Sequence, residues 1–319
     1  MKLLTGTLVV ALLIMIGYIA IQYTETMPGL SDPGECLNLD VYTEYFRSDV
    51  YNKKLPYSKA AGSRVCLVNY KNATDPTWNE LISFLNSDDT DEILYIEGSF
   101  VCADFAEMLH NNAETAGIKA AFVCVDFASD DEDGHALNAF NTTDRGLVYV
   151  DCTGEGFLHP VSHSQIFKDS TRYCPHFNYS CDKIAYIVEG EECGMINIDK
   201  ASALEYWFYE DYAAKWNEHE RELEAYTSEV NEYNRAIAAH DKEVKAYEAA
   251  VGGRTSISDP GEYERLDKRY KKLKAREKEL DVTGDELETK RERLAERQED
   301  LGWYRWKPLS VVTDVKVHW

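Results

Sequence analysis

The hydrophobic and polar positions between residues 77 and 151 change from one period to another. In residues 77–87 and 102–117, apolar side chains recur three and four positions apart, which predicts two helices lying on a core. In residues 118–126, 135–140 and 146–151, short runs rich in β-forming residues are separated by polar loops, which predicts three antiparallel strands. Helices combined with antiparallel strands define the α+β class.

Residues 204–301 follow a much longer helical pattern. From Trp216 to Val251, most positions that step alternately by three and four are apolar or aromatic, and from Leu266 to Leu301 every seventh residue is leucine. Heptads sustained over this length predict a coiled coil. The segment GGRTSISDPGE separates the two stretches, so we expect an antiparallel helical hairpin within one chain. Pairing with a second chain into a dimer is the alternative.

Single residues modify this picture of the helical hairpin. Gly284 is expected to weaken or kink the second arm, because glycine is a poor helix former. His219 and His240 fall on the seam between the arms, where we expect a structural, partly buried role rather than a metal site. Residues 303–319 are strand-like again and are expected to pack on the globular part.

The N-terminal residues 3–22 carry no charged side chain and, at about 20 residues, are long enough to cross a bilayer as a helix. No small-x-small cleavage site follows them, so we expect an uncleaved single-pass anchor, with a cleaved signal peptide as the alternative. The bulk of the chain would then be extracytoplasmic at the cell membrane, or secreted if a signal is cleaved. The expected domains are the anchor in 1–24, a globular domain in 25–203, the hairpin in 204–302 and a C-terminal strand in 303–319.

Acidic side chains outnumber basic ones, with 57 Asp and Glu against 34 Lys and Arg, and the formal net charge is −23 at pH 7. Such a chain is repelled by nucleic acid and by anionic lipid head groups. We therefore expect protein or peptide partners, no nucleic acid, and contact with the membrane only through the N-terminal anchor.

Eight cysteines and three Asn-X-Ser/Thr triplets are compatible with an exported chain. Cys174 and Cys181 bracket the turn-rich segment CPHFNYSC and are the expected disulfide, while the pairing of the remaining cysteines is left open. The triplets begin at Asn72, Asn141 and Asn178, which are candidate glycosylation sites.

Residue types that together activate a thiol occur at the ends of the predicted elements. Cys102 begins a helix, where unpaired N–H groups and the helix dipole favour a negative charge such as a thiolate. A nucleophilic thiol also needs a base and a group that orients the base. His135 opens one predicted strand and Asp151 ends the next, and a loop centred near residue 143 would place them nearly opposite each other.

The segments CADFAEMLHNNAETAGIKAAFVCVD, GHALNAF and LVYVDCT resemble the three conserved blocks of the transglutaminase-like superfamily, whose members have a papain-like fold. The resemblance covers about residues 75–155 and implies a catalytic domain ahead of the helical hairpin. It implies Cys102 as the nucleophile, His135 as general base and then acid, and Asp151 as the group that orients the histidine. Leu137 departs from the pattern, because many members have an aromatic residue at that position.

The resemblance also implies acyl transfer through a thioester, to water in peptidases and deamidases or to an amine in transglutaminases. We expect a membrane-anchored cysteine peptidase or amidase that acts on cell-surface proteins, with the coiled coil holding or selecting a partner. One alternative is a transglutaminase that forms isopeptide cross-links. The other is a non-catalytic surface module that works through its coiled coil, although such a scaffold has no need of a cysteine at the start of a helix.

The remaining candidates concern an oxyanion site and metal ions. The backbone N–H of Cys102 is the natural first oxyanion donor, and Tyr95 and Trp78 are upstream candidates for the second. Carboxylates just before His135 could bind Ca²⁺, but their spacing matches no dedicated calcium loop, so a solvated loop is expected. These residues are Asp130, Asp131, Glu132 and Asp133. No cysteines have the CxxC spacing of a zinc site, and we expect no cofactor.

Overall fold

The computed structural model describes residues 45–50, 54–128, 134–154, 182–302 and 305–319. Within these ranges, no helix combines the length and the apolar character that crossing a membrane requires. Several predicted features lie outside the described residues: the apolar segment 3–22, Cys174 and Cys181, Asn178, and the acids Asp130, Asp131, Glu132 and Asp133.

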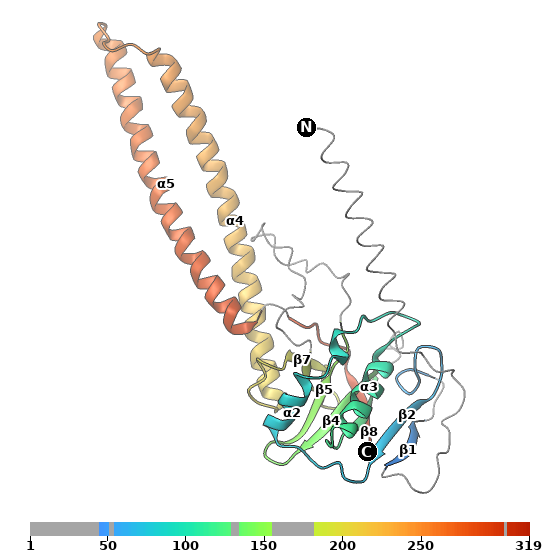
Figure 1. Cartoon of the computed structure of the whole chain (residues 1–319). Coiled ribbons are helices and arrows are strands. Elements are labelled where there is room, and N and C mark those ends of the chain that lie inside the picture. Colours follow the sequence, from blue (N-terminus) through green and yellow to red (C-terminus); the bar gives the residue numbers. More distant parts are fainter. Residues whose placement is uncertain (1–44, 51–53, 129–133, 155–181, 303–304) are drawn as a thin grey trace. The chain divides into compact units, whose positions relative to one another are not determined.

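Two strands, a group of short helices and a run of further strands follow one another up to residue 197, and two long helices then precede a last strand (Figure 1). The elements are β1 Tyr45–Val50, β2 Val65–Tyr70, α2 Trp78–Leu85, the 3-10 helix η1 Thr90–Glu92, α3 Cys102–Thr115, β3 Ala121–Phe127, β4 His135–Thr142, β5 Gly146–Asp151, β6 Lys183–Tyr186, β7 Gly194–Asn197, α4 Tyr206–Val251, α5 Pro260–Leu301 and β8 Val312–His318.

Six strands form one antiparallel sheet in the order β7-β6-β5-β4-β3-β8. The three strands predicted from residues 118–151 are β3, β4 and β5, and they are neighbours in the middle of this sheet. The C-terminal strand β8 returns after the long helices and pairs antiparallel with β3, where Val123 lies across from Val317. The fold is therefore α+β, as the hydrophobic pattern predicts.

Helix α3 packs on the sheet with the residues that its period predicts. Phe105 and Leu109 are fully buried and share one hydrophobic cluster with Phe140 of β4 and Val150 of β5. Burying a phenylalanine or leucine side chain is worth about 1.5–3 kcal/mol. This packing holds the N-terminal end of α3 over the two central strands.

The small sheet of β1 and β2 is attached to α3 by polar side chains. Every second backbone N–H of β2 donates to a side chain of α3, and each acceptor lies one helical turn after the previous one. Two strand residues and one helical turn cover similar lengths, so these positions stay side by side. The acceptors are Glu107 for Cys66 at 2.8 Å, Asn111 for Val68 at 2.8 Å and Glu114 for Tyr70 at 2.7 Å. An edge of β2 is thus paired with α3 rather than with another strand.

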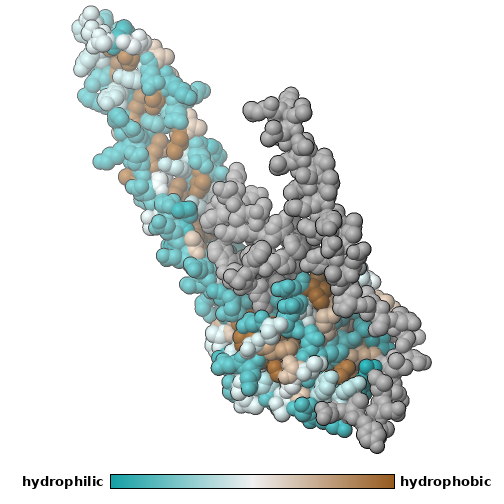
Figure 2. Space-filling model, in the orientation of Figure 1, coloured by the Kyte–Doolittle hydropathy of each residue, from teal (hydrophilic) through white to brown (hydrophobic). Residues whose placement is uncertain are grey.

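Helices α4 and α5 pack along each other as the predicted hairpin (Figure 1). The heptad leucines are all buried: Leu266, Leu273, Leu280, Leu287, Leu294 and Leu301. Figure 2 shows hydrophobic residues as a stripe between the two helices, with hydrophilic residues on the outside. Lys290 of α5 lies 2.6 Å from Glu229 of α4, while Arg254 and Glu262 pair near the tip at 2.8 Å, so the two helices run antiparallel.

Helix α5 is continuous through Gly284, the position at which a weakened or kinked arm is predicted. A Cβ at this position would lie 2.8 Å from the hydroxyl of Tyr233 on α4. Glycine therefore makes room for a tyrosine that crosses the seam. His219 is buried and its Nε2 lies 3.3 Å from Oε1 of Gln298, which agrees with a structural role.

The base of the hairpin belongs to the main core. Tyr212 and Trp216 of α4 and Leu301 of α5 lie in the same hydrophobic cluster as Phe105. The hydroxyl of Tyr212 also donates to the carbonyl oxygen of Leu301 at 2.9 Å. The two helix ends are thereby fastened to the domain that carries the sheet.

Candidate active site

Cys102 is the first residue of α3, so it lies where the helix leaves its first N–H groups without intrahelical partners. Its thiol is free, and 7% of the residue is exposed. Asp104 accepts hydrogen bonds from the backbone N–H groups of Val101 and Ala60, at 3.0 and 3.1 Å. These bonds fasten the chain at the start of α3 and so fix the position of the Cys102 sulfur.

His135 is the first residue of β4, and Asp151 is the last residue of the neighbouring β5. Their side chains meet, with Nε2 of His135 2.9 Å from Oδ2 of Asp151. Gly134 permits this arrangement, because a Cβ there would lie 2.7 Å from both the ring of Pro56 and the carbonyl oxygen of Val125. The Gly-His order at the start of β4 thus has a steric reason.

The register between β4 and β5 differs by two positions from the predicted one. Thr142 pairs with Gly146, so the turn is centred on residue 144 rather than 143. Asp151 is consequently a diagonal neighbour of His135, not the residue opposite it. The contact survives because a shift of two residues keeps both side chains on the same face of the sheet, and a diagonal pair is still within reach.

The Cys102 thiol lies close enough to the His135 side chain to interact with it electrostatically, and His135 in turn contacts Asp151, so the three side chains form one cluster. An ionised carboxylate can only accept, so the His135 proton that faces Asp151 is on Nε2. Nδ1 is then the nitrogen that can take a proton from the thiol. The three predicted residues come from α3, β4 and β5, and the structure brings them into one site.

Electrostatics in this cluster favour a charged His135. Burial opposes the charge, but the Asp151 carboxylate outweighs burial and raises the pKa of His135 to about 10. Burial would likewise raise the pKa of Asp151, yet Lys183 and His135 together hold that pKa well below its usual range. A protonated imidazole beside an ionised carboxylate is the environment that a thiolate at Cys102 requires.

Lys183 belongs to this cluster, although no sequence motif identifies it. It is the cross-strand partner of Asp151 in the β5–β6 register, and its Nζ lies 3.8 Å from Oδ1 of Asp151, with 2% of each side chain exposed. The ammonium group donates to the carbonyl oxygen of Thr153 at 2.7 Å and lies 4.2 Å from the ring centroid of Trp306. Lysine is almost never buried so fully unless it is paired. Its partner is distant in sequence, so only the strand register reveals the pair.

The structure separates the two aromatic oxyanion candidates. Tyr95 lies on the loop before α3. Its ring stacks on Phe105, which is about one helical turn after Cys102, with the ring centroids 6.4 Å apart. Trp78 is buried at the start of α2, where its backbone N–H donates to Oδ1 of Asp144 at 2.7 Å, in the turn between β4 and β5. That turn is at the far end of β4 from the histidine, roughly 20 Å away at the usual rise of a strand. Trp78 is therefore a core residue and not a donor to the site.

Other predicted sites can be placed on the described residues. Cys66 is disulfide-bonded, whereas the other four described cysteines are free and buried. Asn72 and Asn141 are exposed, as glycosylation requires. Among the residues that the structure describes, no group of three or more His, Cys, Asp or Glu side chains is placed to hold a metal ion.

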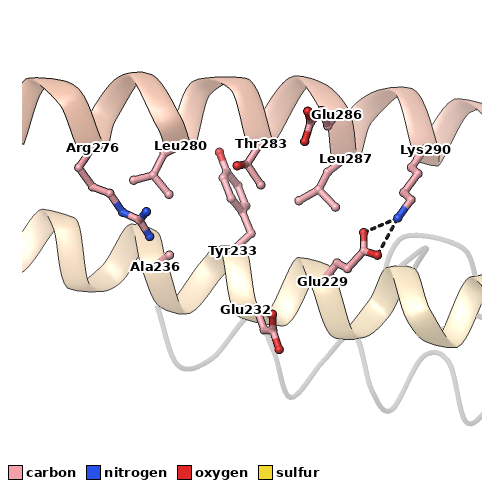
Figure 3. A pocket seen from close by; sticks show the side chains of 10 residues that line it. All are labelled: Glu229, Glu232, Tyr233, Ala236, Arg276, Leu280, Thr283, Glu286, Leu287 and Lys290. Atoms are coloured by element: carbon pink, nitrogen blue, oxygen red, sulfur yellow. Dashed lines mark hydrogen bonds and ion pairs between the residues drawn. The ribbon is translucent and has the colours of Figure 1, made fainter.

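A groove of about 680 Å³ lies between α4 and α5, away from the triad (Figure 3). Tyr233 crosses it toward α5, and the Lys290–Glu229 ion pair closes one end. Half of the lining residues are charged, and none is a cysteine or histidine. The groove follows from the packing of the hairpin.

Comparisons of this chain with protein-family models, curated proteins and solved structures find no match. The functional assignment consequently depends on the geometry of the Cys102, His135 and Asp151 cluster.

Proposed function

We propose that this protein is a cysteine acyl-transfer enzyme with a Cys102–His135–Asp151 triad in a transglutaminase-like, papain-like core. The observation that carries the proposal is the cluster of thiol, imidazole and carboxylate, in which Nε2 of His135 lies 2.9 Å from Oδ2 of Asp151 and the Cys102 thiol interacts with the same imidazole. A thiol that only filled space would not need an imidazole and two charged groups beside it, because burying charged groups is costly. The packing of α3 on the strands that carry His135 and Asp151 also supports the proposed core.

The proposed reaction begins when Nδ1 of His135 takes the thiol proton and the Cys102 sulfur attacks the carbonyl carbon of an amide. A C–S bond forms while an electron pair moves onto the carbonyl oxygen. The carbonyl then re-forms, the C–N bond breaks, and His135 gives its proton to the leaving amine. In the second half, His135 takes a proton from water, the resulting hydroxide attacks the thioester, and the C–S bond breaks. The thiolate recovers the proton, and a carboxylic acid leaves.

The negative charge on the carbonyl oxygen needs donors that are in place before the reaction. The backbone N–H of Cys102 is the proposed first donor, because the first N–H groups of α3 have no partners within the helix. Tyr95 is the proposed second donor, since it lies one helical turn from Cys102 through its contact with Phe105.

We propose water as the acyl acceptor and exported or cell-surface proteins as substrates, which makes the enzyme a peptidase or amidase. The Cys66 disulfide supports a location outside the reducing cytoplasm. The uncharged segment 3–22 supports anchoring in the cell membrane. The net charge of −23 favours a protein or peptide substrate over a nucleic acid.

The test is the rate at which iodoacetamide alkylates the full-length protein in detergent as a function of pH. We expect fast labelling that persists around pH 5 to 6, where an ordinary thiol is almost fully protonated. His135→Ala should abolish this fast phase, and Cys102→Ala gives the background from the buried cysteines. A profile that follows an ordinary thiol in the wild type would refute the triad.

A second assay separates the acyl acceptors once the thiol is shown to be activated. The wild type is incubated with an unfolded protein substrate and a fluorescent primary amine. Release of new carboxyl termini without incorporation of the amine is expected for a peptidase. Incorporation of the amine that is lost in Cys102→Ala would assign transglutaminase activity instead.

A further inference from the structure

Three consecutive large apolar residues are exposed on the loop before the helix that begins with Cys102. Leu94, Tyr95 and Ile96 are 37%, 40% and 43% exposed, and we refer to them as the apolar wall. Single exposed apolar residues are ordinary on protein surfaces, whereas a contiguous group marks a contact surface.

The apolar wall lies between the two elements that hold the ends of the triad. On one side, Tyr95 stacks on Phe105 in the first turns of α3. On the other side, the residues just before the wall pack on Gly154. A Cβ at Gly154 would lie 2.7 Å from the carbonyl oxygen of Asp91 and would also collide with the carbonyl oxygen of Ile93. Gly154 follows closely after the end of β5. A molecule bound at the wall is therefore close to both the nucleophile and the strand that orients its base.

The loop that carries the wall is held by backbone bonds. Ile96 and Phe100 exchange two hydrogen bonds, N–H to O at 2.9 Å and 2.8 Å, and Gly98 with φ +75° makes the turn between them. The ring of Phe100 packs edge-on against Phe105 with the centroids 4.6 Å apart. A surface already ordered in the free protein loses little conformational entropy on binding, which favours tight recognition.

The charges around the wall indicate the chemistry of its occupant. Glu92 and Glu97 are exposed on either side of it along the chain. No Lys or Arg occurs between residues 72 and 118, so these carboxylates are not neutralised from within that segment. An apolar surface bracketed by carboxylates suits an apolar side chain with basic neighbours.

We propose that Leu94, Tyr95 and Ile96 form a substrate subsite that binds an aromatic or aliphatic side chain of a basic peptide segment beside the scissile amide. This subsite rests on the proposed acyl-transfer function and specifies its substrate class. Binding there would hold the carbonyl carbon near Cys102, which accelerates the chemical step by positioning.

Peptidyl chloromethyl ketones test the subsite, because the Cys102 thiolate displaces chloride and forms a C–S bond without requiring turnover. The full-length protein is labelled with lysine-containing probes in which phenylalanine, leucine, alanine or aspartate occupies each of the three positions nearest the ketone. At one position we expect phenylalanine or leucine to react roughly 10- to 100-fold faster than alanine, the range that contact in an apolar pocket provides.

Leu94→Ser and Ile96→Ser are the test variants, and Leu147→Ser is the control, because Leu147 is an exposed leucine on β5. The preference for apolar probes should fall toward unity in the test variants and stay intact in the control. Glu92→Gln with Glu97→Gln should raise the rate of the aspartate-bearing probes toward that of the alanine-bearing probes, because the repelling carboxylates are removed. Iodoacetamide labelling of Cys102 should be unchanged in all of them.

Equal rates for phenylalanine, leucine and alanine probes at all three positions in the wild type would overturn the subsite. A preference that survives in both test variants would overturn it as well. If Cys102 nevertheless keeps fast, His135-dependent labelling by iodoacetamide, the triad stands and only the subsite is wrong. If that labelling is absent in the wild type, the acyl-transfer function itself fails.

Discussion

Replacing Lys183 with methionine tests whether the buried ammonium group keeps Asp151 ionised. At 3.8 Å the attraction between the two charges is about 4 kcal/mol for an effective dielectric constant near 20. Removing one partner of a buried pair costs about 3–5 kcal/mol, because the remaining charge is left in the interior without compensation. We expect the free energy of unfolding at pH 7 to fall toward the lower end of this range, since His135 still contacts the other carboxylate oxygen.

The same substitution changes the pH dependence in a defined direction. The pKa of Asp151 is held low in the wild type, so the stability that its carboxylate contributes is present above about pH 3.9, its unfolded value, and is lost as the pH falls through the folded value. Without Lys183 the folded pKa rises, and protonation begins at a higher pH. We expect the acid limb of Cys102 alkylation to move upward by about one to two pH units, at 1.36 kcal/mol per unit.

Urea unfolding and iodoacetamide labelling between about pH 2 and pH 8, on the order of half a unit apart, measure the two effects. Lys183→Arg is the matched control, because it keeps the positive charge and should retain the wild-type acid limb even if it packs less well. If Lys183→Met does not fold, Lys183→Gln keeps a donor to Thr153 and allows the same comparison. An unchanged acid limb in a folded, uncharged variant would refute the reasoning.

Three further predictions concern single positions. Gly134→Ala should destabilise the fold by about 1–3 kcal/mol and slow Cys102 alkylation, because φ is +89° and a Cβ collides with Pro56; a urea midpoint and labelling rate equal to the wild type would contradict this. Gly284→Ala should fail to bring the roughly 1 kcal/mol gain usual in a helix, since the new Cβ meets the Tyr233 hydroxyl, and Tyr233→Phe in the same chain should restore the gain in thermal unfolding. The pKa of His135 is raised to about 10, so the stability that its protonated ring contributes is fully present below about pH 6.5 and is lost as the pH rises toward 10. In urea unfolding the wild type should lose stability over that interval, and His135→Ala should lose less.

The heptad pattern predicts some features of the hairpin and leaves others undetermined. Leucines seven residues apart must lie on one side of a helix, and all six heptad leucines of α5 are buried against α4 or the core. The steric partner of Gly284 was not predictable in the same way, because Tyr233 belongs to the other arm and its ring position depends on how the helices are offset. Propensity alone predicts a weakened helix at Gly284, and it does not reveal that glycine makes room for Tyr233 there.

The candidate site likewise has features that the local sequence predicts and features that depend on tertiary packing. The residue types and their places at element ends predicted Cys102, His135 and Asp151, since a helix start and two adjacent strand ends are local features of the pattern. The two-residue error in register left the contact intact, because strand side chains alternate with period two. Trp78 was a poor candidate because its distance from the site depends on which end of β4 it packs against.

The sequence by itself determined the α+β class, the coiled-coil hairpin and the three residues of the triad, because periodicity and element ends are encoded within short stretches of chain. Only the tertiary structure decided that Lys183 lies against Asp151, that Tyr95 rather than Trp78 lies beside α3 near Cys102, and that Leu94, Tyr95 and Ile96 are exposed on the loop before Cys102. Those contacts join residues that are distant along the chain or depend on exposure. They are set by strand register and by packing, which no local pattern specifies.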